Sequence, residues 1–156
     1  LAFLGPLLGS LVRPVGGWMS DRLGGARVTQ WATLGLIAAA VLAGTQLAGV
    51  AGDAHPEARF PLVFALFLLL FAFAGVGNGS TFRQIPVIFP GKEAGPVVAW
   101  TSAVAAYGSL LVPDLFRPHV AAGTAEVALY GCAGFYALCL VVNWWFYARR
   151  GAEVRC

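Results

Sequence analysis

Four long stretches of this 156-residue chain contain no Asp, Glu, Lys or Arg. They run from Thr29 to Gly52, from Pro61 to Phe82, from Ala94 to Pro113 and from Val127 to Ala148. Each is about as long as the roughly 20 residues that a helix needs to cross the hydrocarbon core of a bilayer. A fifth stretch, Leu1 to Ser20, is interrupted only by Arg13. The pattern predicts an all-α membrane protein with five spans, at about residues 1–20, 29–52, 61–89, 94–113 and 127–148.

The composition excludes an ordinary soluble domain. Charged residues make up 11% of the chain and hydrophobic residues 59%, whereas a soluble domain carries about 25% charged residues. A β-barrel is disfavoured because its strands would alternate in polarity over about ten residues, and here the apolar runs are continuous. The net charge of +3 comes without a basic stripe with interleaved aromatic residues. We therefore expect the lipid bilayer as a partner, and no nucleic acid.

No motif in the chain indicates an enzyme, a metal site or a cofactor. Cys132 and Cys139 lie seven residues apart, or roughly 10 Å along a helix, which exceeds the reach of an ordinary disulfide. His55 and His119 fall in predicted loops without a nucleophile motif nearby. We expect no catalytic residues, no metal and no cofactor.

The loops between the predicted spans differ in charge. If the spans alternate in direction, the first and third loops share a side with the C-terminal tail, and this side carries six basic residues: Arg22, Arg27, Lys92, Arg149, Arg150 and Arg155. The other side carries two, Arg59 and Arg117. Because cytoplasmic loops collect Lys and Arg, we expect the carboxyl terminus in the cytoplasm. The chain starts inside an apolar run, so we also expect it to be the carboxyl-terminal piece of a longer protein.

Arg13 is the one charge near the middle of a predicted span, since Arg83 lies toward the end of the third. On a helix, Arg13 shares a face with small and polar residues: Pro6, Gly9, Ser10, Gly16, Gly17 and Ser20. The residues on the opposite face are large and apolar: Leu7, Leu8, Leu11, Val12, Val15, Trp18 and Met19. Because small-residue faces pack against other helices, we expect Arg13 to point into the bundle. It lies eight residues, or roughly 12 Å, from Asp21 and so near the bilayer midplane. Snorkelling to the surface is the alternative.

An intramembrane arginine that points inward needs an anion. None of the uncharged spans offers a carboxylate. The counter-charge of Arg13 is therefore either an acidic group in the rest of the protein or a bound anionic ligand, and such intramembrane charges usually mark a substrate pathway.

The segment after the first span has the form GxxxDRxGxxR, made by Gly17, Asp21, Arg22, Gly24 and Arg27. It resembles the loop motif of the major facilitator superfamily, found between helices two and three and, in variant form, between helices eight and nine. The glycines permit a tight turn between two antiparallel spans. We expect Asp21 to face a neighbouring helix N-terminus and the arginines to hold the loop on the cytoplasmic side.

Three longer stretches, FLGPLLGSLVRPVGGWMSDRLGGARVT, FAGVGNGSTFRQIPVIF and WTSAVAAYGSLLVPDLF, together resemble the nitrate/nitrite porter (NarK-like) family and span Phe3 to Phe116. The resemblance implies that the five spans are helices 8–12 of a twelve-helix major facilitator fold, with the amino-terminal half missing. In that family one arginine from helix two and one from helix eight clamp a planar anion, and Arg13 corresponds to the second. The implied activity is transport of nitrate, nitrite or both across the bacterial inner membrane by alternating access.

Three further polar residues are candidates for contact with the anion: Asn78, Ser102 and Tyr107. Asn78 shares a helix face with Ala72, Gly75, Gly79 and Phe82, where an interhelical hydrogen bond is the alternative. Tyr107 either contacts the anion or packs. The sequence departs from the family at Ala99 and Ala105, where glycine is typical, which puts the pocket width in question.

The mode of transport is predicted from the lack of acidic residues and histidines in the predicted spans. No Asp, Glu or His falls inside a predicted span, and a proton-coupled carrier usually needs a titratable side chain in its pathway. This favours nitrate/nitrite exchange, as in an antiporter that serves nitrate assimilation. The alternatives are a facilitator for another small anion or organic acid, and a non-transporting membrane sensor or scaffold. A sensor would need a signalling domain after the last span, for which the tail ARRGAEVRC is too short.

Overall fold

The computed structural model describes residues 1, 3–50, 53 and 55–152, and within these ranges it contains helices and no strand. The predicted all-α class is therefore confirmed. The α-helices are α1 (Leu4–Leu23), α2 (Gly25–Ala48), α3 (Phe60–Ile88), α4 (Ala94–Ala106), α5 (Gly108–Ala121) and α6 (Ala125–Asn143). Short 3₁₀ turns, Pro56–Arg59 and Gly91–Glu93, precede α3 and α4, and a π-helical turn, Trp144–Ala148, extends α6.

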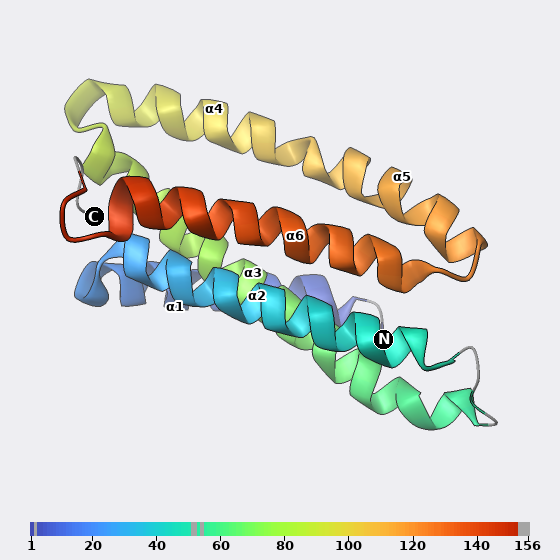
Figure 1. The fold of residues 1–156 in the computed structure, drawn as a ribbon. Coiled ribbons are helices and arrows are strands. Elements are labelled where there is room, and N and C mark those ends of the chain that lie inside the picture. The colour runs from blue at the N-terminus through green and yellow to red at the C-terminus, as the bar shows by residue number, and fades with distance from the viewer. Residues whose placement is uncertain (2, 51–52, 54, 153–156) are drawn as a thin grey trace.

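The long helices run back and forth along one direction (Figure 1). α3 packs against both α1 and α2, and α2 packs in turn against α6. α4 and α5 follow one another along the far side of α6 and touch the other helices little. The connections after α1 and α3 and the end of α6 gather at one end, and those after α2 and α5 gather at the other (Figure 1). Consecutive spans thus alternate in direction, as the charge argument assumed.

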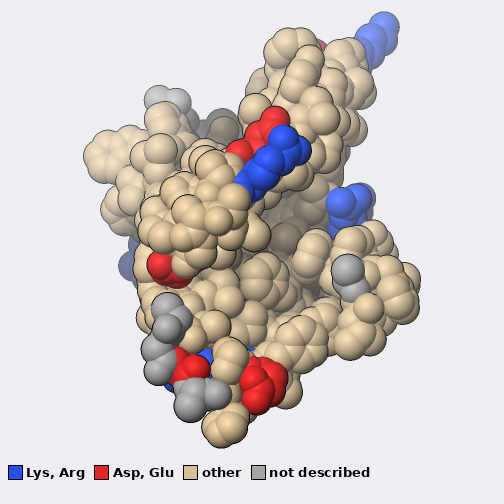
Figure 2. All heavy atoms as spheres, turned by 90° about the vertical axis from the view of Figure 1, so that its right-hand side faces the viewer, with Lys and Arg blue, Asp and Glu red and all other residues tan. Residues whose placement is uncertain are grey.

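In the part of the chain that the structure describes, four helical segments are long and apolar enough to cross a membrane: Gly25–Ala48, Pro56–Ile88, Gly91–Ala121 and Ala125–Ala148. α1 has the length of a span, but its glycines and its charged residues make it less apolar than the other four. Large apolar side chains cover much of the surface, among them Trp31 and Trp100, which are each more than 70% exposed. Seen from the end that carries the connections after α2 and α5, most of the surface is uncharged, and an acidic and a basic group lie side by side on it (Figure 2). Such a surface suits a lipid environment.

Two helix boundaries differ from the prediction. The segment between the first two spans, expected as a loop from Asp21 to Arg27, is reduced to Gly24, because α1 continues to Leu23 and α2 begins at Gly25. Gly24 has a φ of 91°, a conformation that favours glycine. The fourth predicted span bends at Tyr107 and continues beyond Pro113 to Ala121. Pro113 and Pro118 each remove only one helical hydrogen bond, and the helix persists through both.

The continuation of the fourth predicted span to Ala121 places two titratable residues in a helix. Asp114 and His119 were expected in a loop, but they lie in α5. Asp114 is exposed and forms an ion pair with Arg117, three residues later, at 3.4 Å. Residues 51, 52, 54 and 153–156, and with them the end of the second predicted span and the tail residues Arg155 and Cys156, lie outside the described ranges.

Candidate functional site

Glycines bring the backbones of α1 and α3 together. Gly9 and Gly16 of α1 and Gly75 of α3 are buried. A Cβ atom at Gly75 would collide with the carbonyl oxygen of Gly9, and one at Gly16 with the backbone of Val76. Side chains at these positions would force the helices apart, so the close approach depends on glycine.

An open groove of about 320 Å³ runs along this contact. It is lined by Pro6, Gly9, Ser10 and Arg13 of α1 and by Phe71, Ala74, Gly75 and Asn78 of α3. Arg13 and Asn78, both singled out in the sequence, thus meet in one groove from two helices. The structure places Arg13 at the edge of the packed face of α1, where it is exposed, while the buried residues are Gly5, Gly9, Gly16 and Ser20. The expectation that Arg13 points into the bundle does not hold within these helices alone.

The groove presents hydrogen-bond donors without a counter-charge. Among the described residues, neither Arg13 nor Asn78 has a side-chain hydrogen bond or an ion pair, and none of the residues that line the groove is acidic. The interhelical hydrogen bond considered for Asn78 is therefore not formed within the described part of the chain. Arginine offers five N–H donors, and the Asn78 amide and the Ser10 hydroxyl add more. Such a groove suits a small anion with oxygen acceptors.

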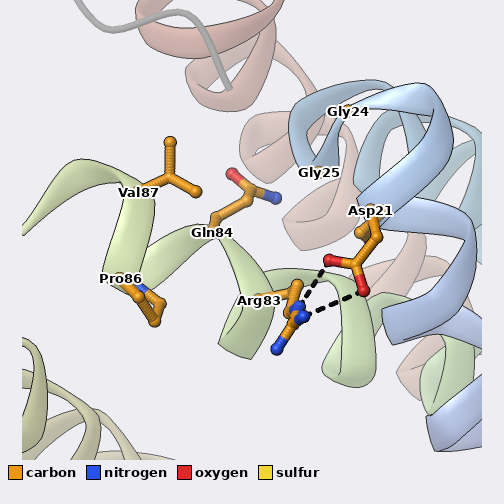
Figure 3. A pocket seen from close by; sticks show the side chains of 8 residues that line it. Asp21, Gly24, Gly25, Arg83, Gln84, Pro86 and Val87 are labelled. Atoms are coloured by element: carbon orange, nitrogen blue, oxygen red, sulfur yellow. Dashed lines mark hydrogen bonds and ion pairs between the residues drawn. The ribbon is translucent and has the colours of Figure 1, made fainter. Parts of the chain in front are cut away.

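The loop motif forms a second pocket, of about 450 Å³, where α1, α2 and α3 meet (Figure 3). Asp21 accepts two hydrogen bonds there from Arg83, at 2.5 Å from Nε and 2.9 Å from Nη2. Asp21 was expected to face a helix N-terminus, but the planar fork of Arg83 offers two parallel, charge-assisted hydrogen bonds instead. Arg22 lies over the ring of Trp18 at 4.2 Å, and Arg27 is exposed.

A buried polar network that the sequence reasoning missed joins α2 to α3. Ser80 is fully buried; its hydroxyl donates to the carbonyl oxygen of Gly25 at 2.8 Å and lies 2.6 Å from the hydroxyl of Thr29. The Gln84 amide donates to the same Thr29 hydroxyl at 2.5 Å. The sequence pattern that could have predicted this network is a pair of polar residues at i and i+4 in each helix, Thr29 with Thr33 in α2 and Ser80 with Gln84 in α3.

Two of the candidate contact residues do not line the groove of Arg13. Ser102 is exposed on α4, and its hydroxyl donates to the carbonyl oxygen of Val98 at 2.7 Å. Tyr107, at the junction of α4 and α5, is 63% exposed and lines a separate pocket with Ala103, Ala106 and Leu110. Their contact with an anion stays a prediction.

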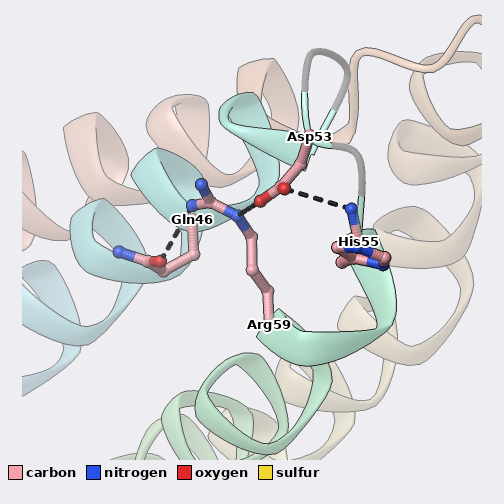
Figure 4. A network of polar contacts seen from close by, with 4 residues as sticks. All are labelled: Gln46, Asp53, His55 and Arg59. Atoms are coloured by element: carbon pink, nitrogen blue, oxygen red, sulfur yellow. Dashed lines mark hydrogen bonds and ion pairs between the residues drawn. The ribbon is translucent and has the colours of Figure 1, made fainter.

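At the other end of the helices, a polar cluster closes the connection between α2 and α3 (Figure 4). The guanidinium of Arg59 donates to Asp53 at 2.6 Å and to Gln46 at 3.3 Å. The backbone N–H of His55 donates to the other carboxylate oxygen of Asp53 at 3.2 Å. The cluster anchors the start of α3 to the end of α2.

Long apolar helices that alternate in direction and pack through glycines define a multi-spanning membrane protein with a partial major facilitator fold. The chain belongs to the nitrate/nitrite porter family of that superfamily. It is 46% identical over 156 residues, 99% of the chain, to the probable nitrate/nitrite antiporter NarK2 of Thermus thermophilus, and the match covers 34% of that protein. It is 31% identical over 172 residues, 96% of the chain, to the nitrate/nitrite transporter NarU of Escherichia coli (strain K12), of which 36% is covered.

A more distant relative is the nitrite extrusion protein of Bacillus subtilis (strain 168), with 28% identity over 129 residues, 83% of the chain and 28% of the relative. The chain thus spans about a third of the length of the curated relatives it matches. A comparison with protein-family models gave no match.

Proposed function

We propose that the chain is the carboxyl-terminal part of a secondary transporter that moves nitrate, nitrite or both across a bacterial inner membrane by alternating access. The observation that carries the proposal is the groove between α1 and α3, in which the cation Arg13 and the amide of Asn78 have no partner among the described residues. The names of the relatives, which describe nitrate/nitrite transporters and antiporters, agree with it.

In this proposal the α1–α6 segment corresponds to helices 8–12, and the groove faces the missing amino-terminal half. Arg13 donates two parallel hydrogen bonds to two oxygens of the planar anion, because the guanidinium fork matches that geometry. Asn78 contributes an N–H donor from the opposite wall. The resemblance supplies a second arginine, from helix two, that completes the clamp. Desolvation of the anion is offset by these charge-assisted hydrogen bonds.

The orientation is part of the proposal. The end that carries Arg22, Arg27, Lys92, Arg149 and Arg150 faces the cytoplasm, because positive charge collects there. Trp144 and Trp145 are exposed in the π-helical turn, and Arg149 lies over the Trp145 ring at 4.6 Å. Aromatic residues next to basic ones are typical of the membrane–water interface.

Exchange of one anion for another is the proposed mode of transport. The only acidic residue of α1 and α3 is Asp21, which is paired with Arg83 at the cytoplasmic end and lies outside the groove. Asp114 and His119 lie in α5, near the end of that helix at Ala121. Asp114 is paired with Arg117, and His119 Nδ1 lies 3.4 Å from the Thr124 hydroxyl, so both have partners outside the groove. Two arginines that face an empty site repel each other, so the carrier closes readily only with an anion between them. Obligatory exchange follows from this electrostatic constraint.

The test uses the full-length transporter in proteoliposomes loaded with nitrite at equal pH on both sides. We expect rapid nitrate uptake that depends on internal nitrite. Nitrate accumulation driven by a proton gradient, with no internal anion, would refute exchange. If neither nitrate nor nitrite is transported while another small anion is, the substrate assignment is wrong.

A further inference from the structure

The backbone of Arg13 lies directly against Gly79 of α3. A Cβ atom at position 79 would collide with the carbonyl oxygen of Arg13 and would lie 3.0 Å from its carbonyl carbon and 3.1 Å from the backbone nitrogen of Gly17. These are main-chain atoms of a helix, so they cannot rotate out of the way as a flexible side chain can. Any side chain at position 79 must therefore move α1 away from α3 at the residue that carries the cation.

The same kind of contact recurs one turn along each helix. A Cβ at Gly75 would collide with the carbonyl oxygen of Gly9, and a Cβ at Gly9 would lie 3.1 Å from the carbonyl oxygen of Phe71. Gly9, Phe71 and Gly75 all line the groove. The bottom of the groove is thus a backbone-to-backbone contact, whereas its walls carry the side chains of Arg13 and Asn78.

The helix around Arg13 needs such an external support. Pro14 has no N–H and cannot donate to the carbonyl of Ser10, so α1 lacks one of its own hydrogen bonds in the turn that holds Arg13. On the other side, Asn78 directly precedes Gly79. One contact therefore fixes the backbone positions of both Arg13 and Asn78.

We propose that Gly79 is a positioning residue for Arg13: the glycine contact of α3 with the Arg13 carbonyl sets the separation of Arg13 from Asn78, and thereby the size of the oxyanion that the groove accepts. The inference rests on the proposed function, because it assigns a determinant of size selectivity to the same groove. A methyl group at position 79 widens the groove and displaces the guanidinium of Arg13, so that its N–H groups no longer align with the oxygens of a planar anion.

The test compares G79A with G77A in the full-length transporter. Gly77 lies on the same helix, but a Cβ there would meet only the Cβ of Ala32, at 3.5 Å, which is an ordinary contact. Initial rates of nitrate and chlorate uptake into nitrite-loaded proteoliposomes give KM and maximum velocity for each anion. We expect G79A to raise the KM for nitrate by at least about tenfold, because a shift of about 1 Å in a bound geometry has effects of this order. The preference for nitrate over the larger chlorate should fall, while G77A should match the wild type.

A purely structural role for Gly79 gives a different result. It lowers the yield of folded protein or the maximum velocity, but it leaves KM and the nitrate/chlorate preference unchanged. That outcome in folded G79A, or an equal rise of KM in G77A, overturns the proposal. If G79A does not yield monodisperse protein, G9A provides a milder intrusion into the same groove, with its Cβ 3.1 Å from the Phe71 carbonyl oxygen.

For G9A we expect the same direction of change, with KM raised about threefold, and a wild-type preference would overturn the proposal. Failure of the proposed function is recognised separately, because then the wild-type transporter itself takes up no nitrate.

Discussion

Replacing Arg13 by lysine separates the role of its charge from the role of its geometry. Lysine retains the positive charge but presents a compact ammonium in place of a planar fork. Arg13 is exposed and has no side-chain hydrogen bond or ion pair among the described residues, so the substitution breaks no polar contact within these helices. We expect the free energy of unfolding to change by no more than about 0.5 kcal/mol.

The effect on anion binding follows from the hydrogen bonds. The guanidinium donates two parallel hydrogen bonds to two oxygens of nitrate, whereas an ammonium in the same place donates one. A hydrogen bond to a charged group contributes about 1.5–3 kcal/mol. Since about 1.4 kcal/mol corresponds to a tenfold change in affinity, the loss of one such bond weakens nitrate binding by roughly 10- to 140-fold.

Isothermal titration of nitrate into the purified full-length transporter measures this change, and a thermal melt checks the fold. The matched control is Arg117→Lys, which exchanges the same residue types at an exposed position of α5, outside the groove. We expect this control to bind nitrate with wild-type affinity. If Arg13→Lys also binds nitrate with wild-type affinity, the reasoning from the fork geometry is wrong.

Three further substitutions test other parts of the structure. Asp21→Asn weakens the two hydrogen bonds from Arg83, which lie outside the groove. Nitrate exchange should therefore slow, while the Kd for nitrate stays within about twofold of the wild-type value. Loss of nitrate binding with a normal rate of exchange would contradict this. Ser80→Ala removes two hydrogen bonds from a fully buried site and should lower the free energy of unfolding by about 1–3 kcal/mol, and an unchanged melting temperature would count against the network. Arg59→Gln removes a partly exposed ion pair with Asp53 and should lower the free energy of unfolding by less than about 1 kcal/mol. A larger decrease in the free energy of unfolding would contradict this.

The helices were largely predictable from the sequence because the bilayer imposes one simple rule. Charges are costly in hydrocarbon, so the uncharged runs coincide with the spans. The end of α5 was not predictable in this way. Asp114 follows Pro113, and both residues are typical of a loop, but the helix continues for two more turns with Asp114 paired to Arg117. Local preference is a weak guide where a single missing hydrogen bond is tolerated.

The groove was predictable only in part. Arg13 was recognisable because it is a charge in an apolar run, and Asn78 because it lies in a small-residue stripe; the structure brings these two together. The pair of Asp21 and Arg83, which lie 62 positions apart, depends on the way α1 crosses α3. The contact of Ser80 with Thr29 likewise depends on helix packing and not on spacing within either helix. Pairings of this kind become visible only once the crossing of the helices is known.

The glycine contact between α1 and α3 also bears on how the chain is made. α1 is less apolar than the other spans, and an arginine near the centre of a helix opposes insertion by about 2.5–3.5 kcal/mol. The surface that holds α1 in place belongs to α3, whose Gly79 follows Arg13 by more than 60 residues. At about 5–20 residues per second, the ribosome needs roughly 3–13 s to synthesise that interval.

Among the helices of this segment, α1 has only the adjoining α2 as a partner during this time. The Cβ of a residue at position 17 would lie 3.9 Å from the carbonyl oxygen of Gly79, at ordinary contact distance. We therefore expect a chain that stops after Ala48 to leave a cysteine at Gly17 accessible to a water-soluble maleimide, and a chain that extends past Phe89 to protect it. Equal protection in both chains would refute this order of assembly. Within this segment, the glycine contacts that hold Arg13 in the finished protein thus make the packing of α1 depend on α3, a helix that the ribosome has yet to synthesise when α1 reaches the bilayer.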